Sequence, residues 1–328
     1  MKLVGLFCGG YSSEYEISVK SAKQILATVN SIEEIEAYLV YVSRDGWVID
    51  YNGEQINVSQ DDLTFHSKKD GEKAINLAHV YIHGNPGENG KLQAFFEMKR
   101  IPYINSNSLA SALSFDKWFC NQFLKSFGIN VAESILLTRN KSIDYKSITT
   151  KLGLPLFVKP ADSGSSYGIS KVYSLEDLPS AIEDAFKEGK TVVCESFMNG
   201  TEVTCGIYEN KSGIIALPCT EIVSETDFFD YEAKYLGKSQ EITPARISDE
   251  LTLTIQALTK EIYQLLQLRS LARVDYMIVN DVPYVIEVNT TPGFSPESIV
   301  PKMLEAAGIE KDDFWREIYE FEGEIGGL

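Results

Sequence analysis

Two apolar segments near the C-terminus, 271–279 and 283–290, place the strongest constraint on the fold. Both are rich in Val and Ile, which favour strands, and a short polar turn separates them. Polar side chains interrupt each segment two positions apart, so the pair on each segment shares one strand face. In chain order they are Arg273, Asp275, Glu287 and Asn289. The pattern predicts two antiparallel strands with a charged patch on one face.

Charged residues inside apolar strands usually pair with one another or hold a metal ion. Asp275, Glu287 and Asn289 offer only oxygen ligands, which suit Mg²⁺ or Mn²⁺ and not zinc. A solvated sheet face is the alternative, and the apolar neighbours in both segments weaken it. We therefore expect a metal site on this pair of strands.

The register of the two strands tests this expectation. A plain two-residue turn would set Asp275 opposite Ile286 and put Glu287 on the other face of the sheet. The metal site therefore predicts a three-residue turn or a β-bulge that places Asp275 opposite Glu287. Arg273 then lies opposite Asn289.

The N-terminal third of the chain alternates between strand and helix patterns. The expected elements are strands at 2–8, 37–42, 47–49 and 78–82, and helices at about 17–26 and from about 91. Apart from the short strand at 47–49, residues 44–75 are polar, and irregular structure is expected there. The alternation predicts a parallel α/β domain.

Beyond about residue 105 the pattern changes. Strands are expected at 155–158, 191–197 and 202–207, and helices at 116–127, 175–188, 251–265 and from about 297. The small residues of loop 163–168 would let backbone N–H groups approach phosphate oxygens, although the loop taken alone favours an ordinary flexible hairpin. Lys159 ends a buried strand, where its charge needs an anionic partner or must reach solvent.

Composition excludes several classes of function. The chain has 328 residues, with 30 Lys and Arg against 47 Asp and Glu, a net charge of −17 and a pI near 4.7. This balance argues against general binding to nucleic acid or anionic membranes. No apolar run is long enough to span a membrane, and the N-terminus does not resemble a signal peptide, so a cytoplasmic location is expected. The cysteines form no CxxC pair and are expected to be buried thiols: Cys8, Cys120, Cys194, Cys205 and Cys219.

Seven segments in order along the chain resemble the D-alanine–D-alanine ligases, a family of ATP-grasp carboxylate–amine ligases. Three segments resemble ATP-grasp enzymes in general: 158–160, 273–275 and 287–293. Four segments narrow the resemblance to the ligase family: 9–18, 83–90, 231–235 and 295–301.

The resemblance implies an α/β fold, with α+β character in its ATP-grasp part. A Rossmann-like parallel α/β domain at 1–105 would carry the first D-alanine site. A two-lobed ATP-grasp fold would follow, with a central lobe at 106–199 and a C-terminal lobe at 200–328 that includes a lid loop at 224–246. ATP and two Mg²⁺ or Mn²⁺ ions would bind there, and the enzyme would be a cytoplasmic homodimer.

The resemblance also implies the roles of individual residues. ATP would be bound by Lys117, Lys159, Ser165, Ser166, Glu195, Phe197, Met198, Glu202 and Lys234. The two D-alanines would be bound by Glu16, His83, Arg273, Ser298 and Ile299, with Glu16 on the first ammonium group. Catalysis would use Glu16, Ser165, Tyr235, Arg273 and the N–H of Gly293, of which the last two would stabilise the oxyanion. The metal ligands would be Asp275, Glu287 and Asn289.

The implied activity is ATP-dependent ligation of two D-alanines through an acyl phosphate, for peptidoglycan synthesis. A ligase with D-serine or D-lactate as second substrate is the alternative, and Tyr235 speaks against D-lactate. An oxidoreductase would need a GxGxxG loop, which residues 5–10 do not provide. A non-catalytic nucleotide-binding protein is disfavoured because the charged residues of the chemistry are intact. The D-amino-acid preference rests on the resemblance alone.

Overall fold

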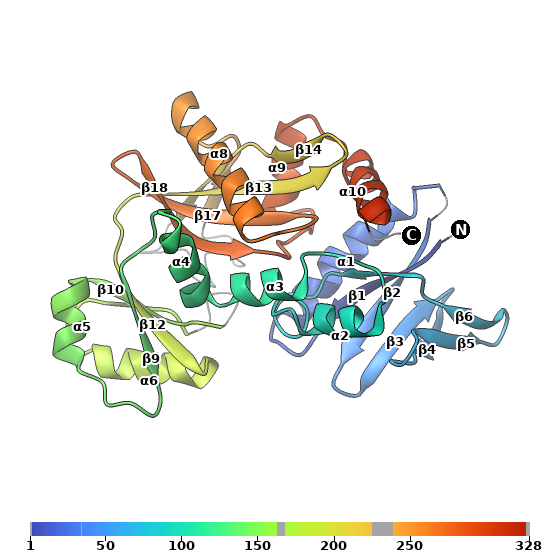
Figure 1. Ribbon diagram of the computed structural model, residues 1–328, viewed down its shortest axis with the longest axis horizontal. Coiled ribbons are helices and arrows are strands. Elements are labelled where there is room, and N and C mark those ends of the chain that lie inside the picture. Colours follow the sequence, from blue (N-terminus) through green and yellow to red (C-terminus); the bar gives the residue numbers. More distant parts are fainter. Residues whose placement is uncertain (1, 34, 163–167, 225–238, 326–328) are drawn as a thin grey trace.

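The computed structural model describes residues 2–33, 35–162, 168–224 and 239–325. Within these residues the strands form three large sheets and one two-stranded sheet. Figure 1 shows the N-terminal sheet in blue at the right, the second sheet in yellow-green at the lower left and the third sheet above it. Each large sheet lies inside one of the three ranges expected for the domains, and the domain boundaries remain a prediction.

The N-terminal sheet has the strand order β4-β3-β2-β1-β7-β8. Its strands are β1 (Lys2–Gly9), β2 (Ile35–Ser43), β3 (Gly46–Tyr51), β4 (Glu54–Asn57), β7 (Leu77–Val80) and β8 (Tyr103–Ile104). The four strands β2, β1, β7 and β8 pair in parallel and are connected in part through α1 (Tyr15–Val29) and α2 (Lys91–Lys99). β3 and β4 add to the sheet in antiparallel pairs. The sheet is therefore mixed, and the expectation of a parallel sheet holds only for its core.

The strand expected at 47–49 lies within β3, but the expectation of irregular structure over the rest of 44–75 is wrong. These residues form β3, β4 and the separate hairpin of β5 (Thr64–Ser67) and β6 (Gly71–Ala74). Positions of β4 and β6 alternate between exposed and half-buried, and no residue of either strand is fully buried. Short polar strands at a sheet edge lack the apolar alternation on which strand prediction depends.

The second sheet is antiparallel, with the order β11-β10-β12-β9. Its strands are β9 (Ser134–Thr138), β10 (Leu156–Pro160), β11 (Ser170–Val172) and β12 (Thr191–Ser196). Leu156 and Val158 pack into one apolar cluster with α5 (Tyr145–Leu152) and α6 (Leu178–Glu188). Because side chains alternate along a strand, Phe157 and Lys159 project from the opposite face of β10.

The third sheet has the order β16-β15-β13-β17-β18, and β14 pairs with β13. Its strands are β13 (Thr201–Asn210), β14 (Gly213–Ala216), β15 (Thr220–Ser224), β16 (Ser239–Ile242), β17 (Ala272–Val279) and β18 (Val282–Asn289). Helix α8 (Asp249–Leu265) contributes Ile255 and Ile262 to the apolar cluster on one face of this sheet. The expected amphipathic helix at 251–265 is thereby confirmed.

The predicted register of β17 and β18 is also confirmed. Asp275 pairs with Glu287 and Arg273 pairs with Asn289, with a bulge between Asp275 and Tyr276. The turn itself has only two residues, both with positive φ, and Val279 pairs with Val282 across it. The bulge alone therefore shifts both carboxylates onto one face.

The remaining helices join the parts of the fold. They are α3 (Ser108–Phe115), α4 (Lys117–Ser126), α9 (Ile299–Ala306) and α10 (Lys311–Ile325). Figure 1 shows α10, the C-terminal helix, beside α1 of the N-terminal domain. Phe294, Phe314 and Trp315 share one buried cluster with Ile25 of α1. The C-terminal part is thus packed into the core of the N-terminal domain.

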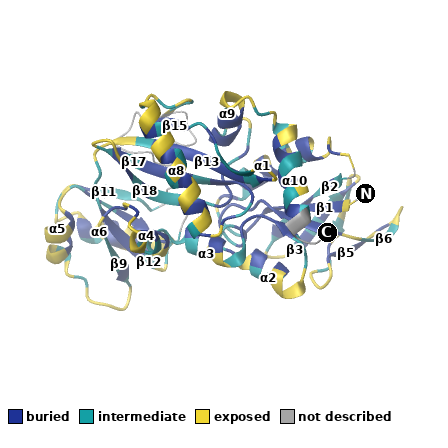
Figure 2. Ribbon diagram, turned by 45° about the horizontal axis from the view of Figure 1, so that its top comes forward, coloured by how far each residue is buried: buried dark blue, intermediate teal, exposed yellow. Residues whose placement is uncertain are grey.

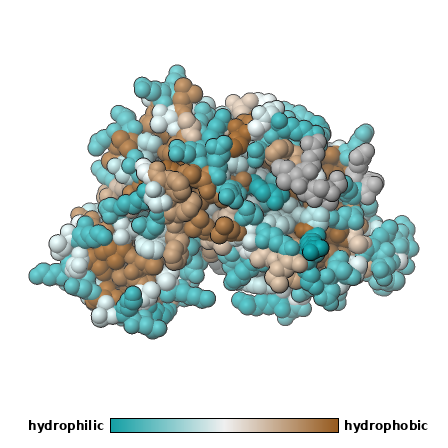
Figure 3. All heavy atoms as spheres, viewed as in Figure 1, coloured by the Kyte–Doolittle hydropathy of each residue, from teal (hydrophilic) through white to brown (hydrophobic). Residues whose placement is uncertain are grey.

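Burial and surface follow this architecture. Figure 2 shows buried strands in dark blue and exposed outer faces on α5 and α8. In Figure 3 the visible face is largely hydrophilic, with apolar patches between the polar regions. Among the described residues, no helix is long and apolar enough to cross a membrane. All five cysteines are buried and unpaired, as expected.

Candidate active site

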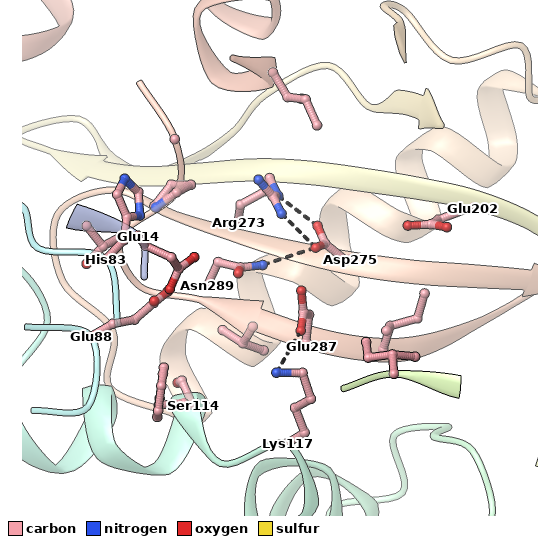
Figure 4. Close-up of a pocket in the computed structure, with 18 of the residues that line it drawn as sticks. Glu14, His83, Glu88, Ser114, Lys117, Glu202, Arg273, Asp275, Glu287 and Asn289 are labelled. Atoms are coloured by element: carbon pink, nitrogen blue, oxygen red, sulfur yellow. Dashed lines mark hydrogen bonds and ion pairs between the residues drawn. The ribbon is translucent and has the colours of Figure 1, made fainter. Parts of the chain in front are cut away.

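A cavity of about 500 Å³ lies where the three large sheets meet. Its lining comes from the loop after β1, the loop after β7, the start of α4, strands β10, β12, β13, β17 and β18, and the segment before α9. In Figure 4, Glu14, His83 and Glu88 lie at one end, Glu202 lies at the other, and the β17–β18 carboxylates lie between them. Residues after the carboxyl ends of β1 and β7 line this cavity, and such strand ends are where ligands bind in open α/β sheets.

Asp275 is the centre of a dense polar cluster on the β17–β18 face. Arg273 donates two hydrogen bonds to it, from Nε to Oδ1 at 2.8 Å and from a guanidinium nitrogen to Oδ2 at 2.7 Å. Thr204 Oγ1 donates to Oδ1 at 2.5 Å, and Asn289 Nδ2 donates to Oδ2 at 3.1 Å. Burial opposes the charge of Arg273, but Asp275 outweighs it and raises the pKa of Arg273.

Glu287 lies beside this cluster and pairs with Lys117 from α4. Lys117 Nζ lies 3.2 Å from Glu287 Oε2 (Figure 4). Asp116 caps α4 by accepting the backbone N–H groups of Trp118 and Phe119, which fixes the helix start beside the cavity. Burial opposes the charge of Lys117, but Glu287 raises its pKa above the ordinary value.

The donor set on this face suits a hard divalent cation shared with phosphates. Asp275 and Glu287 face the same side of the sheet, and Asn289 adds an amide group. Among the described residues, no three His, Cys, Asp or Glu side chains are grouped closely enough to hold an ion by themselves. Mg²⁺ is usually bound by one or two carboxylates together with substrate phosphates, so two carboxylates are sufficient. Arg273 and Lys117 provide the counter-charges in this arrangement.

A second ion pair lies at the face of the second sheet. Lys159 Nζ of β10 is 2.6 Å from Glu195 Oε2 of β12, and their side chains are only 7% and 8% exposed. This pair supplies the anionic partner that the buried position of Lys159 requires. Phe157 and Met198 line the cavity near it. An apolar surface next to buried charged groups suits a flat ring system that carries an anionic tail.

Two carboxyl groups and an imidazole lie at the end of the cavity opposite Glu202: Glu14, Glu88 and His83. Burial, and secondarily the charge of Glu14, raises the pKa of Glu88 to about 8. Glu88 accepts the backbone N–H of Gly84 at 3.0 Å. Burial lowers the pKa of His83, whose Nε2 lies 3.3 Å from Ser21 Oγ. At pH 7, therefore, Glu88 is mostly protonated and His83 is mostly neutral.

The segment before α9 completes the cavity. Ser298 is the N-cap residue of α9, and its Oγ accepts the N–H of Ser295 at 2.9 Å. A side chain on Gly293 would place its Cβ only 2.9 Å from Ser298 Oγ, so a larger residue here would require the Ser298 hydroxyl to move. Ser298 and Ile299 both line the cavity at the N-terminal end of the helix, which favours an anionic group.

Comparison with known proteins identifies the family. The description "D-ala D-ala ligase N-terminus" matches residues 3–106, and "D-ala D-ala ligase C-terminus" matches residues 123–320. A D-alanine–D-alanine ligase of Porphyromonas gingivalis is 46% identical over 311 residues, which cover 94% of each chain. The chain belongs to the D-alanine–D-alanine ligase family.

Solved structures of this ligase family have the same fold. The VanG D-Ala:D-Ser ligase of Enterococcus faecalis matches with a TM-score of 0.86 and 31% identity, over 98% of this chain and 99% of the other. The D-alanine–D-alanine ligase of Bacillus anthracis complexed with ATP matches with a TM-score of 0.79 and 28% identity, over 100% and 99%. The expected ATP-grasp fold and the expected enzyme class are therefore confirmed.

Glu16, expected to bind the first D-alanine, does not line the cavity. Glu16 is exposed on α1, whereas Glu14 is 8% exposed and lines the cavity. The prediction for Glu16 is therefore wrong in its position. The helical spacing of the buried residues of α1 could have indicated Glu14. Ser18 and Ser21 lie on the buried face of α1, and Glu14 precedes Ser18 by four residues, which places it on the same side of the helix.

The other predicted ligase residues have three outcomes. Those that line the cavity are Lys117, Lys159, Glu195, Met198, Glu202, His83, Arg273, Asp275, Glu287, Asn289, Gly293, Ser298 and Ile299. Phe197 is not among the described lining residues; its ring lies 6.0 Å from that of Phe157, which lines the cavity instead. Ser165, Ser166, Lys234, Tyr235 and most of the expected lid loop lie outside the described residues. Glu88 was not predicted, although it lies in the segment 83–90 that carries the resemblance.

Proposed function

We propose that this ligase joins two D-alanine molecules in a reaction that consumes ATP and proceeds through an acyl phosphate. The observation that supports this proposal is a single cavity with two chemically different parts. One end carries Glu14 and the N-terminus of α9, and the adjoining region carries buried cations paired with carboxylates. Its volume of about 500 Å³ is in the range of small-molecule sites.

The first end suits two amino acids. The buried carboxylate of Glu14 would pair with the ammonium group of the first D-alanine, a role that we transfer from Glu16 because Glu14 lines the cavity. Ser298 and the N–H of Ile299, at the N-terminus of α9, would bind the carboxylate of the second D-alanine. His83 would lie near the carboxyl group of the first.

The reaction transfers a phosphoryl group and then an acyl group. A carboxylate oxygen of the first D-alanine attacks the γ-phosphorus of ATP, and the bond from that phosphorus to ADP breaks. The amine of the second D-alanine then attacks the acyl carbon and loses a proton. Collapse of the tetrahedral intermediate breaks the carbon–oxygen bond to phosphate and releases D-alanyl-D-alanine. The first step depends mainly on positioning and charge neutralisation.

The residues of the chain would supply these functions. Lys117 and Lys159 would bind ATP phosphates by exchanging their partners Glu287 and Glu195 for phosphate oxygens. Arg273 and the N–H of Gly293 would stabilise the oxyanion of the tetrahedral intermediate.

Mg²⁺ or Mn²⁺, held by Asp275, Glu287 and Asn289, would supply charge neutralisation for the phosphates. The lid loop expected at 224–246, most of which lies outside the described residues, would exclude water from the acyl phosphate. Peptidoglycan synthesis, a cytoplasmic location and a homodimer remain predictions that accompany this function.

The test is phosphate release from ATP by the purified chain with Mg²⁺, with and without D-alanine. We expect release that depends on D-alanine and a matching amount of dipeptide by mass spectrometry. L-alanine serves as the control, and D-serine and D-lactate in competition with D-alanine test the choice of second substrate. ATP hydrolysis that is independent of D-alanine, or release without dipeptide, would contradict the proposal.

A further inference from the structure

The segment that follows β18 is held in place by the N-terminal domain. Tyr81 Oη donates a hydrogen bond to the Pro292 carbonyl at 2.6 Å. Asn105 Nδ2 donates to Thr291 Oγ1 at 3.1 Å, and the Phe294 N–H donates to Ser21 Oγ at 3.2 Å. Tyr81 and Asn105 follow β7 and β8, and Ser21 lies on α1. Residues 291–294 continue from β18 of the third sheet, but their path is set by contacts with the N-terminal domain.

The bond from Tyr81 fixes the direction of one peptide group. The carbonyl of Pro292 and the N–H of Gly293 belong to the same peptide, which is not among the cis bonds of the described residues. In a trans peptide these two groups point in opposite directions. Pro292 and Gly293 line the cavity, whereas Tyr81 lies behind them and is only 2% exposed. The carbonyl thus points away from the cavity and the N–H toward it.

The Gly293 N–H has no acceptor in the part of the chain that the structure describes. We propose that Tyr81 is a positioning residue that aims the Gly293 N–H at the oxyanion of the tetrahedral intermediate. This inference rests on the proposed function, in which that N–H is an oxyanion donor. It adds a residue that touches neither substrate and acts only through the Pro292–Gly293 peptide.

The surroundings of Tyr81 make its hydroxyl a fixed donor. Its ring packs edge-on against His79, His83 and Trp315, with centroid distances of 5.6, 5.9 and 6.1 Å. Burial raises the pKa of Tyr81 well above its ordinary value, so the hydroxyl keeps its proton at all pH values of interest. Tyr81→Phe would keep these ring contacts and remove only the donor, which leaves the Pro292 carbonyl without its partner.

The chain offers a matched control in the same aromatic cluster. Tyr319 is also buried, and its hydroxyl bonds to His79 Nδ1 at 2.8 Å. Tyr319→Phe removes a buried hydroxyl of the same kind from α10, and the only described partner of that hydroxyl lies outside residues 291–294. A loss of stability common to both variants therefore reports on the cluster, whereas a loss of turnover in Tyr81→Phe alone reports on the peptide.

The experiment compares kcat and KM for the wild-type chain and both variants, below their melting temperatures. Oxyanion stabilisation exists only in the transition state, so we expect Tyr81→Phe to lower kcat about tenfold, the factor that corresponds to one hydrogen bond, with the KM values for ATP and D-alanine unchanged. Tyr319→Phe should keep kcat within about twofold, because it leaves the oxyanion donor in place.

A binding measurement gives a second readout that does not depend on turnover. A phosphinate analogue of the dipeptide, with tetrahedral phosphorus in place of the reacting carbonyl, should bind Tyr81→Phe about tenfold more weakly than wild type. Wild-type kcat for Tyr81→Phe, an equal loss of kcat in both variants, or unchanged analogue affinity would overturn the inference. Failure of the wild-type chain to form dipeptide would instead overturn the proposed function.

Discussion

Glu14→Gln gives the most direct test of the corrected first-substrate site. The carboxylate is 8% exposed and lines the cavity, and Glu88 beside it, with a pKa of about 8, is mostly protonated at pH 7. Glu14 is the carboxyl group at this end to which we assign the ammonium of the first D-alanine. A hydrogen bond between charged groups contributes about 1.5–3 kcal/mol, so its loss should raise the KM for the first D-alanine by about 10- to 150-fold.

Glu16→Gln is the matched control, because it makes the same change two residues further along the chain on the exposed side of α1. We expect its kinetics to equal those of wild type. The assay is phosphate release against D-alanine concentration, fitted for two D-alanine sites, with the KM for ATP measured separately. ATP affinity should change little in either variant, because the described residues proposed to bind ATP lie on α4 and on the second and third sheets or next to them. If Glu16→Gln weakened D-alanine binding while Glu14→Gln did not, the correction would be refuted. An equal loss of ATP affinity in Glu14→Gln would also contradict the role.

Two further predictions concern buried charges. Lys159→Met should lower kcat about 100-fold or more, because the proposed contact with an ATP phosphate is lost. It should also reduce the free energy of unfolding by up to about 3–5 kcal/mol, because the buried carboxylate of Glu195 loses its partner. The double variant Lys159→Met/Glu195→Gln should regain most of that stability in urea unfolding without regaining activity, and a fully active double variant would exclude the role of Lys159. Burial lowers the pKa of His79 to about 3 from 6.5, so protonation of the unfolded chain should cost about 2 kcal/mol of stability between pH 7 and pH 5. His79→Gln should remove this pH-dependent loss of stability. Glu88 has a raised pKa and therefore changes stability with pH in the opposite direction, but it is present in both proteins, so its effect cancels when their stabilities are compared. Parallel profiles of stability against pH for wild type and variant would contradict this prediction.

The local sequence pattern was sufficient to predict structure wherever a residue's position depends on its immediate neighbours along the chain. Charged positions two apart in the two C-terminal apolar segments predicted their shared face. The demand that Asp275 meet Glu287 predicted a three-residue turn or a bulge, of which the structure has the bulge. Amphipathic spacing predicted α8. The polar hairpins between residues 44 and 75 were missed, because strands such as β4 and β6 lie at edges and bury too little to leave an apolar signature.

Contacts between distant segments could not be read from the chain. Glu14 and Glu16 have the same chemistry, and only the packing of α1 on the sheet decides which of them enters the cavity. The partner of Lys159 is Glu195, 36 positions later, because β10 and β12 are neighbours in an antiparallel sheet.

The sequence by itself determined the family, the register of β17 and β18 and most of the residue types that the proposed chemistry needs. Motifs of short range encode those properties, because adjacent side chains have nearly fixed spacing in a strand or helix. Only the tertiary structure decided which Glu lines the cavity, which ion pairs form there, and that Tyr81 holds the Pro292 carbonyl from 211 positions away. Such contacts depend on how whole sheets pack against one another. The hydrophobic effect that drives this packing is not directional, so the order of residues along the chain does not show which distant segments will meet.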